Sequence, residues 1–489
     1  MKVEQNIAVR ATPVIQTAPA EALLNGNGAI MSKNFSEVAS RLDGGSTRYV
    51  ALAPGRLEVM GGLAEYSGTL VLNMSLEESA CVAVQQRRGA VISIAAASKS
   101  DRWSSSEIAV SRLLESNGRG PGGKQAHDSN DSSSDLETCA LAGLREALRA
   151  KLLPVPSAGL SICVRSGLPD ASRCGRNAAV AAATIVACAA ALETGLEPLA
   201  VAAACQRAES DWLGAPVGVA DAVCSLVGEP NTLLEVRCEP CSLGGSIRLP
   251  EDLLLLGIDC DVTDGNAMER YNHARTATLM GRVLIDLIVR HEGDKQGSDL
   301  GSWDGKLSRL SMADFVKRFR DRIPPKMKGK DFLDRFGETG DLATRIDPDK
   351  LYKVRSRTEH HVYEHARARQ FVECLSRGIR GADRKALLDA GELMNASHWS
   401  YGQRCGLGSI ETDLLVNLIR QYGAETDIFG AKVTGRGCGG VVAVLLKPTD
   451  QSFSAIDGAL SDYRSRTGHT PRLLRGSTPG ALVAGVQRF

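Results

Sequence analysis

Residues Ser166–Ala191, SGLPDASRCGRNAAVAAATIVACAAA, join the end of a predicted strand to a long alanine-rich helix. Because backbone N–H groups and the helix dipole attract anions at a helix N-terminus, a loop at this point commonly holds phosphate. Phosphate loops are usually rich in glycine and serine, which bring backbone N–H and hydroxyl groups close to the anion. Here Arg173, Cys174 and Arg176 stand where small residues are expected. The stretch therefore has the position of a phosphate loop without its usual composition.

The overall composition indicates a globular protein of two or three domains. The chain has 489 residues and a formal net charge of +1, so it has no strong electrostatic attraction to nucleic acid or to a membrane surface. No apolar run approaches the ~20 residues of a membrane span, and the N-terminus lacks the basic start and apolar core of a signal peptide. We expect a soluble, cytoplasmic protein with no nucleic-acid partner and no membrane partner.

The hydrophobic periodicity along the chain predicts an α+β protein with two lobes. Residues 1–45 show weak periodicity and are expected to form a loose N-terminal extension. Residues 46–245 begin with alternating apolar runs typical of strands, and helices follow. Residues 115–136 within this first lobe are polar and of low complexity, which predicts a disordered surface insertion. Residues 246–489 start with a buried strand, continue with long helices and form the second lobe.

Two further segments stand out in addition to residues 166–180. One is APGRLEVMGGLAEYSGTLVL at residues 53–72, and the other is GAKVTGRGCGGVVAVLL at residues 430–446. In this order and spacing the three segments resemble the three motifs of the GHMP sugar and small-molecule kinases, in the galactokinase-like branch that includes the kinase half of plant L-arabinokinase. The resemblance extends over roughly residues 48–485. It implies a two-lobed GHMP-kinase-like fold in which ATP and a sugar meet in the cleft between the lobes.

The resemblance gives the first segment a role in binding the sugar. Arg56, in an intact Ala-Pro-Gly-Arg sequence, would lie beside the reacting hydroxyl and stabilise the developing charge. The alternative is that Arg56 is a surface ion-pair partner. Glu65 and Tyr66 match positions that contact sugar hydroxyls, although the family has aspartate where this chain has Glu65. Tyr271, much later in the chain, matches another tyrosine that contacts the sugar.

The second and third segments correspond to the family's nucleotide site. The residues predicted to bind nucleotide are Arg173, Gly175, Arg176, Asn177, Ala178, Gly435, Gly437 and Gly439. In the second segment the family's glycines and serines are mostly replaced. Since a non-glycine residue at positive φ costs about 1–2 kcal/mol, we expect this loop to follow a different path. Two alternatives stay open: Arg173 and Arg176 bind the phosphates directly, or they occupy a site that is no longer used.

Two carboxylates complete the predicted site. Glu209 and Asp221 are twelve positions apart, as they are in the family. The resemblance implies that Glu209, together with Asn177, holds Mg²⁺ and that Asp221 is the base for the sugar hydroxyl. The alternative for Asp221 is a helix cap near Pro216. A helix that starts directly after Pro216 would, however, place Asp221 too far inside for capping.

A histidine-rich stretch, HHVYEH at residues 360–365, is another candidate for chemistry. It places His361 and His365 on one helical face. The stretch lacks the glutamate placement of the HExxH zinc motif. We expect it to form a solvated helix face.

Two functional hypotheses follow. The first is an ATP- and Mg²⁺-dependent kinase that transfers the γ-phosphoryl group to the anomeric hydroxyl of a monosaccharide. The second is a non-catalytic relative that binds a sugar or a partner protein. The presence of Arg56, Glu209 and Asp221 favours the kinase, and the altered second and third segments favour the non-catalytic relative.

Overall fold

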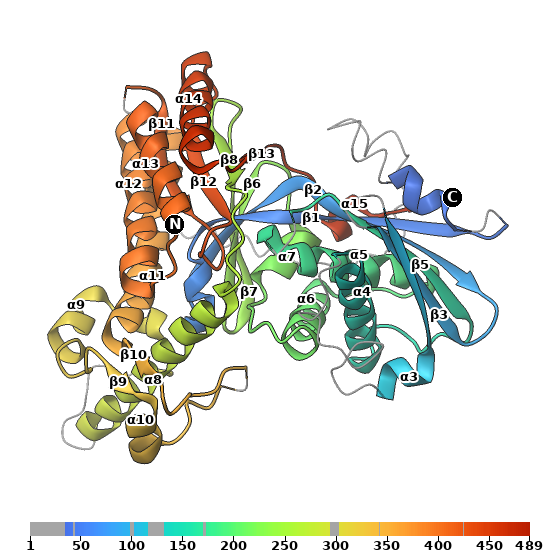
Figure 1. Cartoon of the computed structure of the whole chain (residues 1–489), viewed down its shortest axis with the longest axis horizontal. Coiled ribbons are helices and arrows are strands. Elements are labelled where there is room, and N and C mark those ends of the chain that lie inside the picture. Colours follow the sequence, from blue (N-terminus) through green and yellow to red (C-terminus); the bar gives the residue numbers. More distant parts are fainter. Residues whose placement is uncertain are drawn as a thin grey trace. The chain divides into compact units, whose positions relative to one another are not determined.

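The computed structural model describes residues 35–42, 45–97, 102–115, 132–169, 173–293, 303–341, 343–423 and 425–489 (Figure 1). These residues form two compact units. Unit 1 contains the described residues up to Gly55, together with Glu77–Gly228 and Thr478–Phe489. Unit 2 contains Arg56–Leu76 and Glu229–Ser477. Within the described residues, no helix combines the length and the apolar character needed to cross a membrane.

The two units do not follow the single boundary at 245/246 that the sequence suggested. Two long strands, β1 (Arg48–Met60) and β2 (Leu70–Arg87), each contribute residues to both units. The C-terminal strand β14 (Val486–Arg488) pairs with residues 49–51 of β1 and so returns the end of the chain to unit 1. The difference arises because a strand of 13 or 18 residues pairs with different partners along its length.

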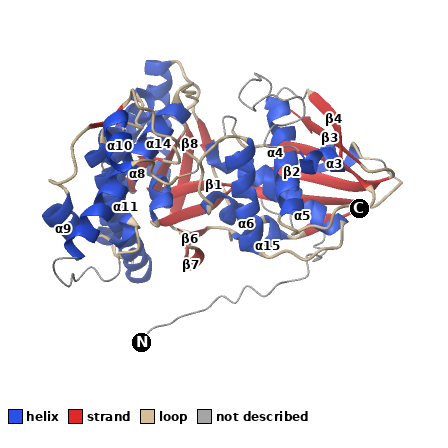
Figure 2. Ribbon diagram, turned by 90° about the horizontal axis from the view of Figure 1, so that it is seen from below, coloured by secondary structure: helices blue, strands red, loops and turns tan. Residues whose placement is uncertain are grey.

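Unit 1 is a sheet with helices packed on it. Its strands follow the order β14–β1–β2–β5–β3–β4, with β5 antiparallel to β2 and parallel to β3. Helices α4 and α5 contact the strands and pack on α6 (Figure 2), and α5 also packs on α7. The additional elements are β3 (Val91–Ala97), β4 (Trp103–Ala109), α3 (Val110–Glu115), α4 (Ser132–Arg149), β5 (Gly159–Ser166), α5 (Arg176–Ala191), α6 (Pro198–Arg207), α7 (Ala220–Val227) and α15 (Ala481–Ala484).

Helix α5 shows why an alanine-rich sequence suits this position. All 16 of its residues are buried, so its small side chains let neighbouring helices approach closely. On the facing helix α4, a Cβ added at Gly143 would lie only 2.9 Å from the Cα and the Cβ of Ala181. The close contact between α4 and α5 therefore depends on glycine and alanine, and it fixes the start of α5 where the second segment ends.

Unit 2 contains a four-stranded sheet, a hairpin and a group of long helices. The sheet has the order β11–β12–β8–β13, with α13 and α14 packed against it, and the β6–β7 hairpin pairs with residues 70–74 of β2. Helix α11 packs on both α8 and α12 (Figure 1). The principal elements are β6 (Thr232–Cys238), β7 (Cys241–Arg248), β8 (Leu254–Asp259), α8 (Ala267–Gly293), α10 (Gly329–Phe336), α11 (Val354–Gly381), α12 (Arg384–Ser400), α13 (Ile410–Gly423), β11 (Ile428–Val433), β12 (Val441–Leu446), α14 (Asp450–Thr467) and β13 (Arg472–Leu474).

Two expectations about flexible regions need correction. Residues 35–40 are helical rather than part of a loose extension, and Val38 is fully buried in a core cluster with Val50 and Cys163. The polar sequence predicted as an insertion over 115–136 includes the first turn of α4, which begins at Ser132. Residues 1–34 and 116–131 lie outside the described residues. The weak periodicity of residues 1–45 hid the first of these helices because its apolar residues, Phe35, Val38 and Leu42, span only about two turns.

Candidate active site

The predicted site residues fall into two groups, one in each unit. Unit 1 contains the second segment together with Glu209 and Asp221. Unit 2 contains the sugar-side residues and the third segment, which comprise Arg56, Glu65, Tyr66, Tyr271, Gly435, Gly437 and Gly439.

The second segment enters α5 through two left-handed residues. Cys174 has φ +55° and Gly175 has φ +70°, and α5 begins directly afterwards at Arg176. A left-handed conformation costs a non-glycine residue about 1–2 kcal/mol, so the backbone at Cys174 is strained. Arg176 and Asn177 are buried, with 4% and 6% of their surface exposed. Residues 170–172 and the side chain of Arg173 lie outside the described part, so the role of Arg173 stays a prediction.

Close packing holds the second segment against the start of the first. A Cβ added at Gly55 would lie 2.7 Å from the carbonyl oxygen of Cys174, so only glycine fits there. Ser225 of α7 donates a hydrogen bond of 2.7 Å to the carbonyl oxygen of Pro54. Helix α7 also contacts the turn over Arg173–Gly175. Unit 1 thus brings together residues Pro54 and Gly55 of β1, the second segment and the helix that carries Asp221.

Asp221 lies closer to the helix start than the sequence suggested. Helix α7 begins at Ala220 instead of directly after Pro216, so Asp221 is in its first turn. A carboxylate in the first turn is stabilised by the helix dipole. The N-cap residue is Val219, which makes no side-chain capping hydrogen bond. The expected depth of Asp221 inside the helix was therefore wrong, although Asp221 is not the N-cap, and its half-buried carboxylate suits either a structural or a chemical role.

The predicted metal ligands have suitable chemistry. Glu209 lies in a single π-helical turn, Ala208–Trp212, and only 4% of its surface is exposed. This turn packs against α5, which carries the buried amide of Asn177. Among the described residues, no three His, Cys, Asp or Glu side chains form a metal cluster. Mg²⁺ often takes only one or two carboxylates from the protein and completes its shell with phosphate and water, so one carboxylate and one amide fit it.

Unit 2 gathers the predicted sugar residues. Tyr66 lies in a short 3₁₀ helix, Gly62–Ser67, and its hydroxyl is 3.0 Å from Nε2 of His361. The guanidinium of Arg275 lies over the Tyr66 ring, 4.4 Å from its centre. Arg275 is held in turn by Asp341, through hydrogen bonds of 2.9 and 3.2 Å. The stacked guanidinium and its ion pair with Asp341 therefore hold the Tyr66 ring in one orientation.

Tyr271 links this group to the third segment. The pKa of Tyr271 is raised to about 12, mainly by burial and also by the charge of Glu65, while the charge of Arg275 opposes the shift. The guanidinium of Arg436 lies 6.0 Å from the centre of the Tyr271 ring. Tyr271 therefore remains a neutral phenol that can donate a hydrogen bond, and it stands between residues of the first and third segments.

Five residues of the third segment have a positive φ, namely Gly435, Gly437, Cys438, Gly439 and Gly440. A Cβ added at Gly437 would lie 2.3 Å from the carbonyl oxygen of Leu407, which excludes other residues. Cys438 has φ +59°, a second strained non-glycine position. A Cβ added at Gly435 would lie 3.7 Å from both terminal nitrogens of Arg56. Arg56 is only 8% exposed, so the alternative of a surface ion-pair partner is wrong.

The sequence reasoning missed a buried polar network around these segments. Glu58 and Lys432 are almost completely buried and form an ion pair of 3.0 Å. His361 is also buried, contrary to the expected solvated helix face, because Ser67 and Tyr66 hydrogen-bond to its two ring nitrogens. A charged residue between apolar neighbours in a buried strand, as Glu58 is between Leu57 and Val59, is the signal that could have revealed part of this network.

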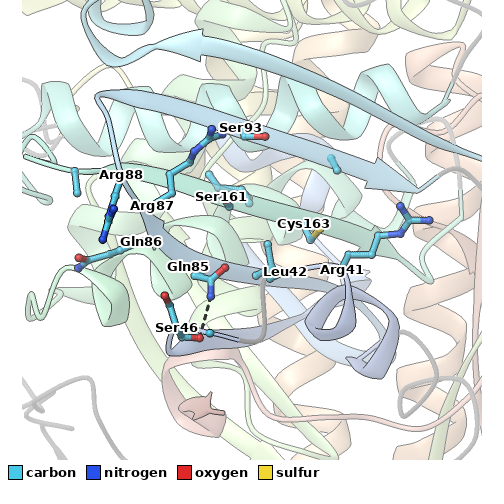
Figure 3. A pocket seen from close by; sticks show the side chains of 14 residues that line it. Arg41, Leu42, Ser46, Gln85, Gln86, Arg87, Arg88, Ser93, Ser161 and Cys163 are labelled. Atoms are coloured by element: carbon cyan, nitrogen blue, oxygen red, sulfur yellow. Dashed lines mark hydrogen bonds between the residues drawn. The ribbon is translucent and has the colours of Figure 1, made fainter.

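A separate cavity of about 780 Å³ in unit 1 contains none of the predicted site residues (Figure 3). Gln85, Ser161 and Ser93 form one row across β2, β5 and β3, and Arg87 extends along it. Arg87 is paired with Glu107 at 2.7 Å. The cavity therefore resembles the polar face of a sheet more than a second active site.

The fold and these three segments are similar to those of the GHMP kinases. Residues 136–229 match the family model described as the GHMP kinases N terminal domain. L-arabinokinase of Arabidopsis thaliana is 29% identical over 488 residues, which cover 90% of this chain and 47% of the relative. This chain thus spans about half the length of that relative. Galactokinase of Mycobacterium tuberculosis is 27% identical over 65% of this chain and 71% of its own length.

Solved structures support the same fold. The structure of Lactococcus lactis galactokinase complexed with galactose has a TM-score of 0.67 at 17% identity, covering 94% of this chain and 100% of its own. The Methanococcus jannaschii mevalonate kinase has a TM-score of 0.54 at 13% identity, covering 88% of this chain and 98% of its own. The predicted α+β fold of the GHMP kinases is confirmed.

Proposed function

We propose that this chain is an ATP-dependent sugar kinase that transfers the γ-phosphoryl group to the anomeric hydroxyl of a monosaccharide. The observation that carries the proposal is the gathering, within unit 2, of Glu65, Tyr66 and Tyr271 beside the glycine-rich third segment. The likeness to L-arabinokinase and galactokinase supports a sugar as the acceptor. Because this chain covers only about half of L-arabinokinase, the sugar named for that relative is the first sugar to test and not an assigned substrate.

Each proposed role follows from the chemistry of the side chain. Asp221 accepts the proton of the attacking hydroxyl, and Arg56 balances the negative charge that develops on the transferred group. Glu65, Tyr66 and Tyr271 bind hydroxyls of the sugar, since a carboxylate accepts hydrogen bonds and neutral phenols donate them. Direct transfer needs little covalent chemistry from the protein, so positioning and charge stabilisation supply most of the rate.

The nucleotide side uses the second and third segments. The N–H groups at the start of α5 bind phosphate oxygens, together with the backbone of the turn 434–440. Glu209 and Asn177 would hold Mg²⁺, which when bound neutralises phosphate charge. Arg176 strengthens phosphate binding if its guanidinium reaches the nucleotide.

We also propose that the protein acts in the cytoplasm on small molecules, a monosaccharide and ATP, without nucleic-acid or membrane partners. The thirteen cysteines are all free thiols, and ten of them are buried. Free cysteines in this number suit a reducing compartment. Expression of the tagged chain in cells, followed by fractionation, tests the location.

The activity test uses purified chain, Mg·ATP and a panel of monosaccharides that includes L-arabinose and D-galactose. ADP release gives the rate, and phosphorus NMR identifies a phosphate on the anomeric carbon. We expect Asp221→Asn to lower kcat by roughly 10²–10⁴-fold, the usual contribution of a general base, with little change in ATP affinity. The control is Asp211→Asn, which removes an exposed carboxylate. Full activity in Asp221→Asn would refute the role of this residue.

A second outcome distinguishes the other candidate function. The altered second and third segments, with Cys174 and Cys438 in place of small residues, are the observation that favours a non-catalytic relative. Calorimetric binding of a sugar without any ADP release, across the panel, would support that relative and refute the kinase.

A further inference from the structure

A single buried hydroxyl joins the first and third segments. Tyr401 follows the end of α12 and is fully buried. The backbone N–H of Leu63, in the first segment, donates to the Tyr401 hydroxyl at 3.1 Å. The hydroxyl in turn donates to the carbonyl oxygen of Gly435, in the third segment, at 3.2 Å. A phenol has one proton to donate and lone pairs to accept, so this arrangement satisfies it in both directions.

The same glycine is held from its other side. The N–H of Gly435 donates to Oε2 of Glu58 at 2.7 Å, and Oε1 of Glu58 accepts from Lys432 at 3.0 Å. Both backbone polar groups of Gly435 are therefore fixed by side chains from outside the turn. Gly435 has φ +62°, so its orientation is set by a left-handed backbone as well as by these hydrogen bonds. The ammonium of Lys432 also lies 5.0 Å from the centre of the Tyr401 ring.

The first segment is fixed to this network at a further point. A Cβ added at Gly62 would lie 2.0 Å from the Glu58 carboxylate, so the turn over residues 61–67 closes directly on Glu58. The N–H of Gly61 donates to Glu364 at 3.3 Å. A shift of the turn 61–67 would break the hydrogen bond from Leu63 to Tyr401, and a shift of the turn 434–440 would break the bond from Tyr401 to Gly435.

We propose that Tyr401 is a positioning residue that couples the sugar turn, residues 61–67, to the nucleotide turn, residues 434–440. The inference rests on the proposed function, because it assigns one ligand to each turn. Both turns are hydrogen-bonded to the same hydroxyl. When a ligand orders one turn, the other turn is therefore also held closer to its ligand-bound conformation. Such a coupling between two sites is reciprocal: each ligand changes the affinity of the other by the same factor, typically 5- to 150-fold.

The test replaces only the hydroxyl. Tyr401→Phe keeps the ring and its packing. Calorimetry measures the Kd of Mg²⁺ with a non-hydrolysable ATP analogue, alone and with saturating L-arabinose or D-galactose, and then the Kd of each sugar with and without the nucleotide. We expect the native chain to show a reciprocal enhancement of about 5-fold or more and Tyr401→Phe to reduce it to less than about 2-fold.

Tyr352→Phe is the matched control. Tyr352 is also a buried tyrosine of unit 2, and its hydroxyl accepts one backbone N–H, from Asp347 at 2.9 Å. It belongs to a different core cluster from Tyr401. We expect Tyr352→Phe to retain the native enhancement. An equal loss in both variants, an unchanged enhancement in Tyr401→Phe, or no enhancement in the native chain would overturn the proposal.

Hydrogen–deuterium exchange without any ligand separates this proposal from the proposed function. Loss of the Tyr401 hydroxyl should speed exchange in both turns together, while Tyr352→Phe leaves both unchanged. Faster exchange in only one turn, or in neither, refutes the link. If the native chain binds neither the nucleotide nor a sugar, the proposed function fails, and the exchange result alone decides whether Tyr401 holds the two turns together.

Discussion

The buried ion pair between Glu58 and Lys432 makes a strong prediction about stability. Lys432 is fully buried and Glu58 is 2% exposed, so neither charge has access to bulk water. Lys432→Met keeps the length of the side chain but leaves the Glu58 carboxylate buried without its cation. Removing one partner of a buried pair usually costs about 3–5 kcal/mol of unfolding free energy, because the remaining charge is uncompensated.

A second substitution should recover part of this loss. Glu58→Gln in the Lys432→Met background removes the remaining charge but keeps an oxygen that can accept from the N–H of Gly435. We then expect a loss of about 1–3 kcal/mol, the cost of an imperfectly satisfied buried polar group. The control is Lys385→Met, which removes an exposed ion pair with Asp389 and should cost less than about 1 kcal/mol.

Equilibrium unfolding in urea at pH 7, with the m-value compared between variants, measures these differences. A loss below about 1 kcal/mol for Lys432→Met would show that water reaches the remaining carboxylate of Glu58. A double variant less stable than Lys432→Met alone would show that the carboxylate is favourable without its cation. Either result would refute the reasoning from burial.

Three other predictions concern the segments and the buried histidines. Arg176→Ala should raise the Kd of Mg·ATP roughly 10- to 100-fold by calorimetry if the guanidinium binds phosphate, and an unchanged Kd would leave Arg176 a purely structural residue. Gly437→Ala should weaken nucleotide binding and lower the free energy of unfolding by at least about 1–2 kcal/mol. The control Gly402→Ala, where an added Cβ meets open space, should leave stability nearly unchanged. Equal losses of stability for the two variants in urea unfolding would contradict the turn geometry. Burial lowers the pKa of His365 to about 4. Below pH ~6.5 the unfolded chain therefore binds a proton on this ring that the folded chain does not bind. The free energy of unfolding should fall by up to about 1.4 kcal/mol per pH unit from pH 6.5 toward 4. In His365→Gln the slope of unfolding free energy against pH, measured by urea unfolding at pH 7, 6 and 5, should be smaller by the contribution of one proton. An unchanged slope would show that the ring is not buried as a neutral group.

The sequence could predict those parts of the fold and site that depend on local pattern. The strand, loop and alanine-rich helix over residues 166–191 are present, because periodicity and helix propensity act over short distances. Glu65, Tyr66 and Tyr271 do gather in unit 2. Whether they bind a sugar stays a prediction.

Partners far apart in the sequence could not be predicted. Glu58 and Lys432 are 374 residues apart, and Ser67 and His361 are 294 residues apart. Each of these polar side chains looks like a solvated residue in its own segment, and only the fold supplies the partner that makes burial favourable. The start of α7 was misjudged for a related reason: the chain between Pro216 and Ala220 could have continued the helix, and no local residue marked its true beginning.

The strained cysteines bear on the choice between a kinase and a non-catalytic relative. Among the described residues of the second and third segments, Cys174 and Cys438 are the non-glycine residues at left-handed positions, and each is only 3% exposed. Strain of about 1–3 kcal/mol at a single residue persists only where the surroundings impose that conformation. For Cys438 the surroundings include the hydrogen bond from its N–H to Leu407 and the fixed orientation of Gly435. A turn with no ligand to bind would gain stability by relaxing into an unstrained path. Both segments instead keep a left-handed backbone that suits close approach to phosphate, and this geometry favours the proposal of nucleotide binding even though their residues have changed.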